Sequence, residues 1–148
     1  MLKIQAIDKD HPLWDETIIF AENCSWYAGK RLASRMREND FSGWERVITV
    51  SDNGNIVGFC VFEARGFIPK NFDCSPFINF VFVDERYRGQ RISEKLIRFA
   101  LDYAEGLGFK RVYLKSEHRG LYEKYGFVKI CSFVPVIGRA NQLFVIGI

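Results

Sequence analysis

Charged and small residues are concentrated in one short stretch of the chain, Val83 to Leu96, which reads VDERYRGQRISEKL. An apolar strand pattern ends there, three arginines and a glycine fall within positions 86–91, and a helical pattern then begins. The amino terminus of a helix exposes unpaired N–H groups and carries a partial positive charge, so anions collect at it. Gly89 would also allow a ligand to approach the backbone closely. These residues predict an anion site, with a phosphate or pyrophosphate as its ligand.

The same stretch has a second interpretation, an ordinary capped helix that follows a basic turn. In that case Ser93 caps the helix and Glu94 lies in its first turn. Two phosphate-binding motifs are excluded, because the chain contains neither the G-x-x-x-x-G-K-S/T of a P-loop nor a G-x-G-x-x-G after this strand. Both interpretations stay open on these residues alone.

The elements that must position this stretch follow from hydrophobic periodicity, which predicts a mixed α/β domain in the order β, α, α, β, β, β, α, β, α, β, β. The most distinct are a hairpin at 44–66 with a turn at 52–55, an apolar strand at 77–84 that is typical of a strand covered on both faces, and a helix at 93–107. The other expected elements are a strand at 2–8, one kinked helix or two helices at 11–39, a strand at 111–117, a short helix at 120–126, and strands at 127–134 and 141–148 joined by a turn at 135–138.

Length and composition predict a single domain, residues 1–148, that needs neither a metal nor a disulfide. The net charge of +3 is spread along the chain apart from residues 86–91, whereas a nucleic-acid-binding protein more often shows a stripe of Lys and Arg, so we expect no nucleic-acid partner. No apolar run approaches the ~18 residues of a membrane span, and no signal peptide is visible. The cysteines are far apart and indicate free thiols in a cytoplasmic protein; they are Cys24, Cys60, Cys74 and Cys131.

The stretch at 83–93 resembles the acetyl-CoA loop of the GNAT acetyltransferase superfamily, which reads V-x-P-x-Y-R-G-x-G-x-G/A between a strand and a helix. The matching residues are Val83, Tyr87, Arg88, Gly89 and Ile92. The family's proline falls on Glu85, and its second and third small residues fall on Arg91 and Ser93. A second segment, GLYEKYGF at 120–127, is similar to the family's FYEKLGF and lies at the expected distance, so the resemblance covers residues 45–148.

The resemblance implies an acyl-CoA N-acyltransferase fold for the mixed α/β domain. Its centre would be a mostly antiparallel sheet with one splayed pair of parallel strands, flanked by helices. It also implies acetyl-CoA as co-substrate without a metal, and an amine of a small molecule or peptide as acceptor, and it allows a homodimer.

The resemblance further assigns roles to the residues around the coenzyme. The backbone of Val81, Phe82 and Val83 would pair with the pantetheine arm as an added strand would. The pyrophosphate would be held by the N–H groups of a loop made of Arg88, Gly89, Gln90, Arg91, Ile92 and Ser93. The amine would attack the thioester directly, without an acyl-enzyme, and Tyr122 would be the general acid for the leaving thiolate.

The general base for the incoming amine stays unassigned. Many relatives carry an acid in the strand before the loop, but the comparable residue here is Asn79, whose amide can only orient water or substrate, or bond the backbone. The base candidates are Glu63, Glu117 and His118. His118 would lie one turn before Tyr122 if the short helix began that early. The aromatic residues expected in the acceptor pocket are Trp26 and Tyr27.

Two other functions are compatible with the sequence. A non-catalytic acyl-CoA sensor or regulatory module fits the altered glycine positions and the missing acid, and it predicts coenzyme binding without amine-dependent release of thiol. A basic interaction domain that binds no coenzyme predicts binding that depends on salt and nucleic acid instead.

Overall fold

The structure, a computed structural model, describes residues 1–134 and 140–148. In these residues the strands are β1 (Leu2–Ile7), β2 (Arg46–Asp52), β3 (Asn55–Glu63), β4 (Phe77–Val83), β5 (Arg111–Ser116), β6 (Val128–Phe133) and β7 (Asn141–Gly147). The α-helices are α1 (Trp14–Asn23), α2 (Ala28–Arg37), α3 (Ile92–Gly106) and α4 (Leu121–Lys124), and a short 3-10 helix spans Glu85–Tyr87. The expected order of elements is confirmed, and the turn expected at 135–138 lies outside the described residues.

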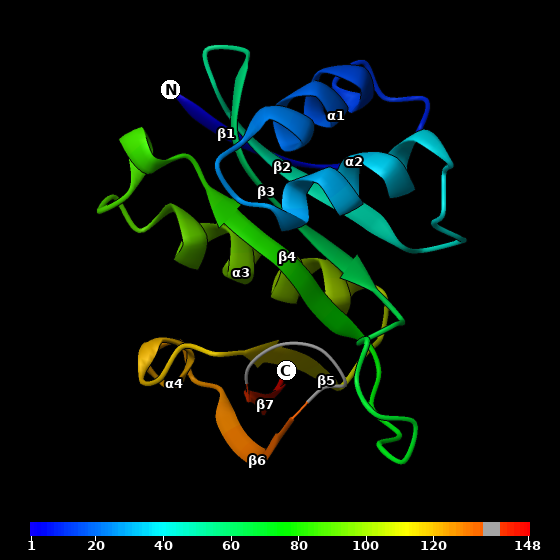
Figure 1. Ribbon diagram of the computed structural model, residues 1–148, viewed down its shortest axis with the longest axis vertical. Coiled ribbons are helices and arrows are strands. Elements are labelled where there is room, and N and C mark those ends of the chain that lie inside the picture. Colours follow the sequence, from blue (N-terminus) through cyan, green and yellow to red (C-terminus); the bar gives the residue numbers. More distant parts are fainter. Residues whose placement is uncertain (135–139) are drawn as a thin grey trace.

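The strands form one mixed sheet in the order β1-β2-β3-β4-β5-β7-β6 (Figure 1). Neighbouring strands are antiparallel except β4 and β5, which run parallel and, in the described residues, pair only between Phe77 and Tyr113. Beyond that pair the two strands diverge, and β5, β6 and β7 lie together with α4 on the far side of the gap (Figure 1). The expected sheet with a splayed parallel pair is therefore confirmed.

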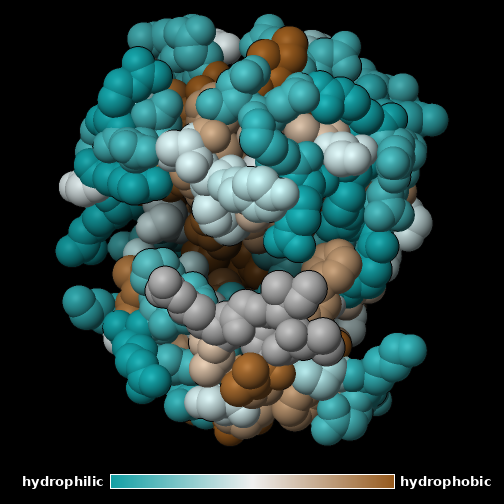
Figure 2. All heavy atoms as spheres, in the orientation of Figure 1, coloured by the Kyte–Doolittle hydropathy of each residue, from teal (hydrophilic) through white to brown (hydrophobic). Residues whose placement is uncertain are grey.

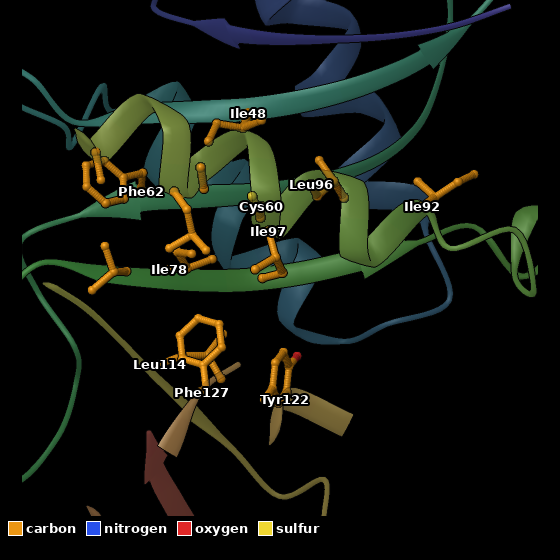
Figure 3. Close-up of a cluster of buried hydrophobic side chains, with 14 of the residues drawn as sticks. Ile48, Cys60, Phe62, Ile78, Ile92, Leu96, Ile97, Leu114, Tyr122 and Phe127 are labelled. Carbon is orange, nitrogen blue, oxygen red and sulfur yellow. The ribbon is translucent and has the colours of Figure 1, made fainter. Parts of the chain in front are cut away.

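Helices cover both faces of the sheet, because side chains alternate along each strand. Phe62 of β3 packs in a core with α3, whereas Phe59 of the same strand packs in a second core with α1 and α2. In β4, Ile78 belongs to the α3 core, drawn in Figure 3, and Phe82 to the other, so this strand is covered on both faces as expected. None of the helices in the described residues is long and apolar enough to cross a membrane.

Glycines shape two connections in the amino-terminal half. The β2–β3 hairpin turns through Asn53 and Gly54, whose φ angles of +51° and +87° are those that a two-residue hairpin turn needs. The helical region at 11–39 forms two helices rather than one kinked helix. Gly29 lies in α2 where an added Cβ would collide with the Ala21 carbonyl oxygen of α1, so this glycine lets the two helices approach closely.

Candidate active site

A groove of about 1550 Å³ opens where β4 and β5 separate. Its walls come from α2, β4, the turn before α3, the end of β5 and α4. Figure 2 shows this face of the molecule as hollowed, with hydrophobic side chains at the bottom of the hollow. The site residues expected from the sequence that line the groove are Trp26, Asn79, Val81, Phe82, Val83, Arg88, Gly89, Arg91, Ile92, Ser93, His118 and Tyr122.

Three expected residues do not line the groove. Tyr27 is 78% exposed just before α2, so it is no longer a candidate for the acceptor pocket. Gln90 is exposed in the turn before α3 and offers the groove no side chain. Glu63 is fully buried at the end of β3 and has no access to a substrate.

A β-bulge in β4 shapes the edge of the strand that borders the groove. Phe80 and Val81 together oppose the single residue Cys60 of β3, and Phe80 has a φ of +56°. The extra residue exchanges the faces of the strand, so Phe82 packs toward α1 and α2 although Ile78, an even number of residues away, packs against α3. Beyond its one pair with β5, the edge of β4 that borders the groove has no strand partner in the described residues.

The turn before α3 leaves the start of that helix without a side-chain cap. The helix begins at Ile92, and Arg91 precedes it in the left-handed conformation, with φ +60° and ψ +27°. Ser93 does not cap the helix, because its hydroxyl oxygen instead lies 3.3 Å from the Tyr125 hydroxyl oxygen. The expectation of an ordinary capped helix is therefore wrong, and the N–H groups of the first turn are open to a ligand.

Arg88 and Gly89 complete this corner. The Arg88 Nε donates a hydrogen bond of 3.1 Å to the Val83 carbonyl oxygen, and its guanidinium lies 5.6 Å from the centre of the Phe82 ring. Gly89 has a φ of +85°, and no heavy atom lies within 4 Å of a Cβ built on it. The corner combines a cation, an uncapped helix start and open backbone, which together suit a phosphate group.

Arg91 stores backbone strain where the family pattern has a small residue. We expect Arg91→Gly to stabilise the protein by about 0.5–1 kcal/mol, because relief of a left-handed conformation, worth about 1–2 kcal/mol, exceeds the entropy that glycine loses on folding. The ion pair with Glu94 that this change removes is exposed and weak. Urea denaturation measures the gain, and Arg91→Ala, which keeps the strain, should show none. A loss of stability in the glycine variant would contradict the strain.

Tyr122 of α4 lies between the groove and the α3 core. The ring is 7% exposed and packs against Tyr125, Phe127 and Phe144, and Figure 3 shows it at the edge of that core. Burial, followed by the charge of Tyr125, raises the pKa of Tyr122 to about 12, against a hydrogen bond with Ser116 that lowers it. The hydroxyl therefore keeps its proton at neutral pH and has a hydrogen to donate.

Glu63 is held in a buried ion pair with Arg35 of α2. The two carboxylate oxygens accept from Arg35 Nη1 and Nη2 at 3.1 and 2.6 Å, and Oε2 also accepts from Asn79 Nδ2 at 2.8 Å. Arg35 extends the network to Asp40. Burial lowers the pKa of Arg35, but the hydrogen bond and charge of Glu63 outweigh it, so the net shift is upward. Glu63 is thus a structural partner of Arg35, and we withdraw it as a base candidate.

Asn79 presents one amide atom without a partner. Its Nδ2 donates to Glu63 at 2.8 Å and to the Arg65 carbonyl oxygen at 2.7 Å, so the amide does bond a neighbouring backbone group. Because the nitrogen faces two acceptors, the orientation of the amide is determined. Its Oδ1 is buried and accepts no hydrogen bond in the described part of the chain, although the residue lines the groove. An N–H donor that reached this oxygen would satisfy it.

Trp26 and His118 come to the groove from two different walls. The Trp26 ring stacks on Phe82, with centroids 5.9 Å apart and planes 8° apart. His118 is exposed on the loop between β5 and α4, and its backbone N–H donates to the Ser116 hydroxyl at 3.0 Å. Because α4 begins only after this loop, His118 does not lie one helical turn before Tyr122, and that expectation is wrong.

Sequence reasoning missed three basic residues of the groove, one of which is Arg35, the partner of Glu63. The other two, Arg31 of α2 and Lys115 of β5, also line the groove. Lys115 directly follows the apolar run Val112–Leu114 of β5, and a charge at that place was a signal that could have identified it. Arg31 carries no such signal, because several basic residues occupy the same helix.

Comparison with known proteins identifies the family. The pattern described as the Acetyltransferase (GNAT) family matches residues 13–127. The chain belongs to this GNAT family. An acetyltransferase from Agrobacterium fabrum is 30% identical over 106 residues, which are 70% of this chain and 72% of that protein. The expected membership is therefore confirmed, and members of the family use acetyl-CoA as co-substrate.

Solved structures of GNAT proteins share the fold. A GNAT acetyltransferase from Streptococcus pneumoniae superimposes with a TM-score of 0.71 at 18% identity, over 100% of both chains. An aminoglycoside 6'-acetyltransferase type Ii gives 0.74 at 17% identity, over 98% of this chain and 96% of its own. An acyl-CoA N-acyltransferase from Pseudomonas aeruginosa gives 0.71 at 17% identity, over 98% and 99%. At these identities the likeness establishes the GNAT fold alone.

Proposed function

We propose that this GNAT protein is an N-acetyltransferase that moves the acetyl group of acetyl-CoA to an amine of a small molecule or peptide by direct attack. One observation carries the proposal: a single groove joins the open edge of β4, the uncapped start of α3 and the hydroxyl of Tyr122. An extended pantetheine arm, a pyrophosphate and a thioester need these three features in the same space.

The residues present fit the coenzyme. The first-turn N–H groups of α3 and the backbone at Gly89 would bind the pyrophosphate, and the charges of Arg88 and Arg91 would add to the attraction. The open edge of β4 would pair with the amides of pantetheine as a further strand does. Because these donors are backbone groups, replacement of two small residues by Arg91 and Ser93 leaves them in place. Acetyl-CoA, when bound, supplies an acetyl group activated as a thioester, from which an amine displaces the thiolate.

Tyr122 would stabilise the sulfur as it leaves. A thiol has an ordinary pKa of about 8.5, well below the value of about 12 for Tyr122, so full transfer of the tyrosine proton to the thiolate is unfavourable. The hydroxyl instead donates a hydrogen bond to the developing negative charge in a largely buried setting, where such donors are most effective. This refines the expected role from general acid to hydrogen-bond donor.

The proton of the acceptor amine needs a different group. Glu63 is engaged by Arg35, and Asn79 has no basic atom. Glu117 and His118 line the groove on the exposed loop after β5, and either reaches the proton directly or through water in this proposal.

A non-catalytic acyl-CoA sensor is the second candidate function. The observation in its favour is that Asn79 occupies the strand position where many relatives carry an acid, while the neighbouring Glu63 is sealed in an ion pair. Such a sensor would bind the coenzyme in the same groove and would release no thiol when amines are added.

Coenzyme binding is the first test of the proposal. Acetyl-CoA at about 100 times its Kd is expected to add roughly 2.7 kcal/mol to the free energy of unfolding, and Tm rises by about 2–4 °C per kcal/mol in a domain of this size. Adenosine nucleotides, which lack pantetheine, should shift Tm less. Thermal unfolding with each ligand measures both effects.

A matched pair of variants places the binding site. Arg88→Glu should weaken the shift, because a carboxylate replaces a cation that lines the groove. Arg86→Glu makes the same charge change in the same turn, but Arg86 pairs with Asp84 and does not line the groove, so its effect should be much smaller. Equal shifts for Arg88→Glu and the wild type would remove this corner from the coenzyme site.

A further inference from the structure

Lys115 lies in the gap between the splayed strands, level with Asn79. The parallel strands β4 and β5 meet at Phe77 and Tyr113. Asn79 and Lys115 each lie two positions after this pair on their own strands. The Lys115 Nζ donates a hydrogen bond of 3.0 Å to the Phe67 carbonyl oxygen and lies 5.5 Å from the centre of the Phe67 ring. Burial, followed by the charge of Arg31, lowers the pKa of Lys115, and the charge of Glu63 opposes this shift only in part. The ammonium group is therefore poorly solvated and lies close to a second cation.

Arg31 of α2 supplies that second cation. Its guanidinium lies 5.8 Å from the centre of the Phe80 ring, and the residue lines the groove. Within residues 1–134 and 140–148, neither Arg31 nor Lys115 forms an ion pair with a carboxylate.

Two acids near this end of the groove are already engaged by other cations. Glu63 is held by Arg35, and Asp40 pairs with both Arg35 and Arg65. Arg31 is exposed, but Lys115 is partly buried, and such a cation without a counter-ion is unfavourable unless a ligand provides the opposite charge. This end of the groove is therefore arranged for an anion.

Asn79 adds a different requirement at the same level of the groove. Its buried Oδ1 accepts no hydrogen bond from the described residues, and its Nδ2 is occupied by Glu63 and Arg65. An unpaired buried oxygen is costly, so a ligand with an N–H donor is favoured there. One small molecule that carries both an anionic group and an N–H donor would satisfy the two cations and the oxygen together.

We propose that the acceptor is a small amine that also carries a carboxylate, an amino acid or a close analogue. Its carboxylate pairs with Arg31 and Lys115, and its amine donates to Asn79 Oδ1. The inference rests on the proposed acetyl transfer and specifies its substrate class. Polycationic acceptors such as polyamines or aminoglycosides are disfavoured, because they bring like charge to this end of the groove.

The test compares amino acids with their neutral amides. We expect kcat/KM for acetylation of leucine, methionine or phenylalanine to exceed that of the matching carboxamide by about ten- to hundredfold, the range expected for a charge-assisted contact. The ratio of kcat/KM for the amino acid to kcat/KM for its amide should fall toward one in Lys115→Met and in Arg31→Met. Lys129→Met removes a lysine that is exposed on β6 and does not line the groove, and its ratio should match the wild type.

Several results would overturn the inference while leaving acetyl transfer intact. One is that acetyl-CoA is bound and used but amides or spermidine are acetylated as efficiently as the acids. Another is that the ratio of kcat/KM between acid and amide is unchanged in both groove variants. If no acceptor turns over, calorimetry with leucine and leucinamide on the protein saturated with CoA decides, since equal binding of the two rejects the carboxylate site. Absence of any coenzyme binding would instead reject the proposed function itself.

Discussion

Replacement of Tyr122 by phenylalanine is expected to lower kcat about a hundredfold, because a donor aimed at developing charge typically contributes 10²–10³ to the rate. Coenzyme binding should survive, since the ring and its contacts with Tyr125, Phe127 and Phe144 are kept. Steady-state kinetics with thiol detection and the acetyl-CoA shift in Tm measure the two effects separately.

The pH profile gives an independent reading of the same residue. The pKa of Tyr122 is raised to about 12, so the hydroxyl stays protonated, and functional, at every pH up to about 11. The kcat of the wild type, measured at saturating acceptor, should therefore show no loss near pH 10 that depends on Tyr122, although an ordinary tyrosine ionises there. A fall in kcat with a pKa near 10 that disappears in Tyr122→Phe would show that burial does not protect this group.

Tyr125→Phe is the matched control for the kinetic prediction. It removes a hydroxyl whose hydrogen-bond partner in the described residues is Ser93, and Tyr125 does not line the groove. We expect kcat within a few-fold of the wild type. Equal rates for Tyr122→Phe and the wild type would assign the stabilisation of the sulfur to another group. Coenzyme binding without any amine-dependent thiol release would favour the sensor.

Replacement of Glu63 by glutamine is expected to destabilise the protein by about 3–5 kcal/mol, which is the usual effect of breaking a buried ion pair. Glu63 is fully buried, and the Arg35 side chain is 13% exposed, so the change leaves a guanidinium with little access to water. At about 2–4 °C per kcal/mol, Tm should fall by roughly 6 °C or more. Urea denaturation and thermal unfolding both measure the loss.

Two comparisons isolate the uncompensated charge. Glu63→Gln combined with Arg35→Met should recover part of the lost stability, because the double variant no longer buries an unpaired cation. Glu22→Gln removes one partner of the exposed pair with Arg37 and should change stability by less than about 1 kcal/mol. A Glu63→Gln protein as stable as the wild type would mean that the pair contributes nothing net.

Local patterns in the sequence were sufficient for the elements. The hairpin turn at Asn53 and Gly54, the apolar strand β4 and the apolar face of α3 each depend on residues a few positions apart, so their order and type could be predicted. The two GNAT-like segments are equally local, and their order along the chain indicated the family and the splayed sheet. The sequence by itself thus determined the fold, the family and the place of the groove.

The tertiary structure alone decided what the individual side chains do. Glu63 looked like a base until its contact with Arg35, 28 residues away, showed it to be a buried partner. The Asn79 oxygen that no described residue hydrogen-bonds belongs to an amide oriented by the same carboxylate, and the charge of Arg31 acts on Lys115 from a helix on another wall of the groove. Burial, charge balance and hydrogen-bond satisfaction are sums over neighbours that are distant in the chain, so no local pattern can contain them.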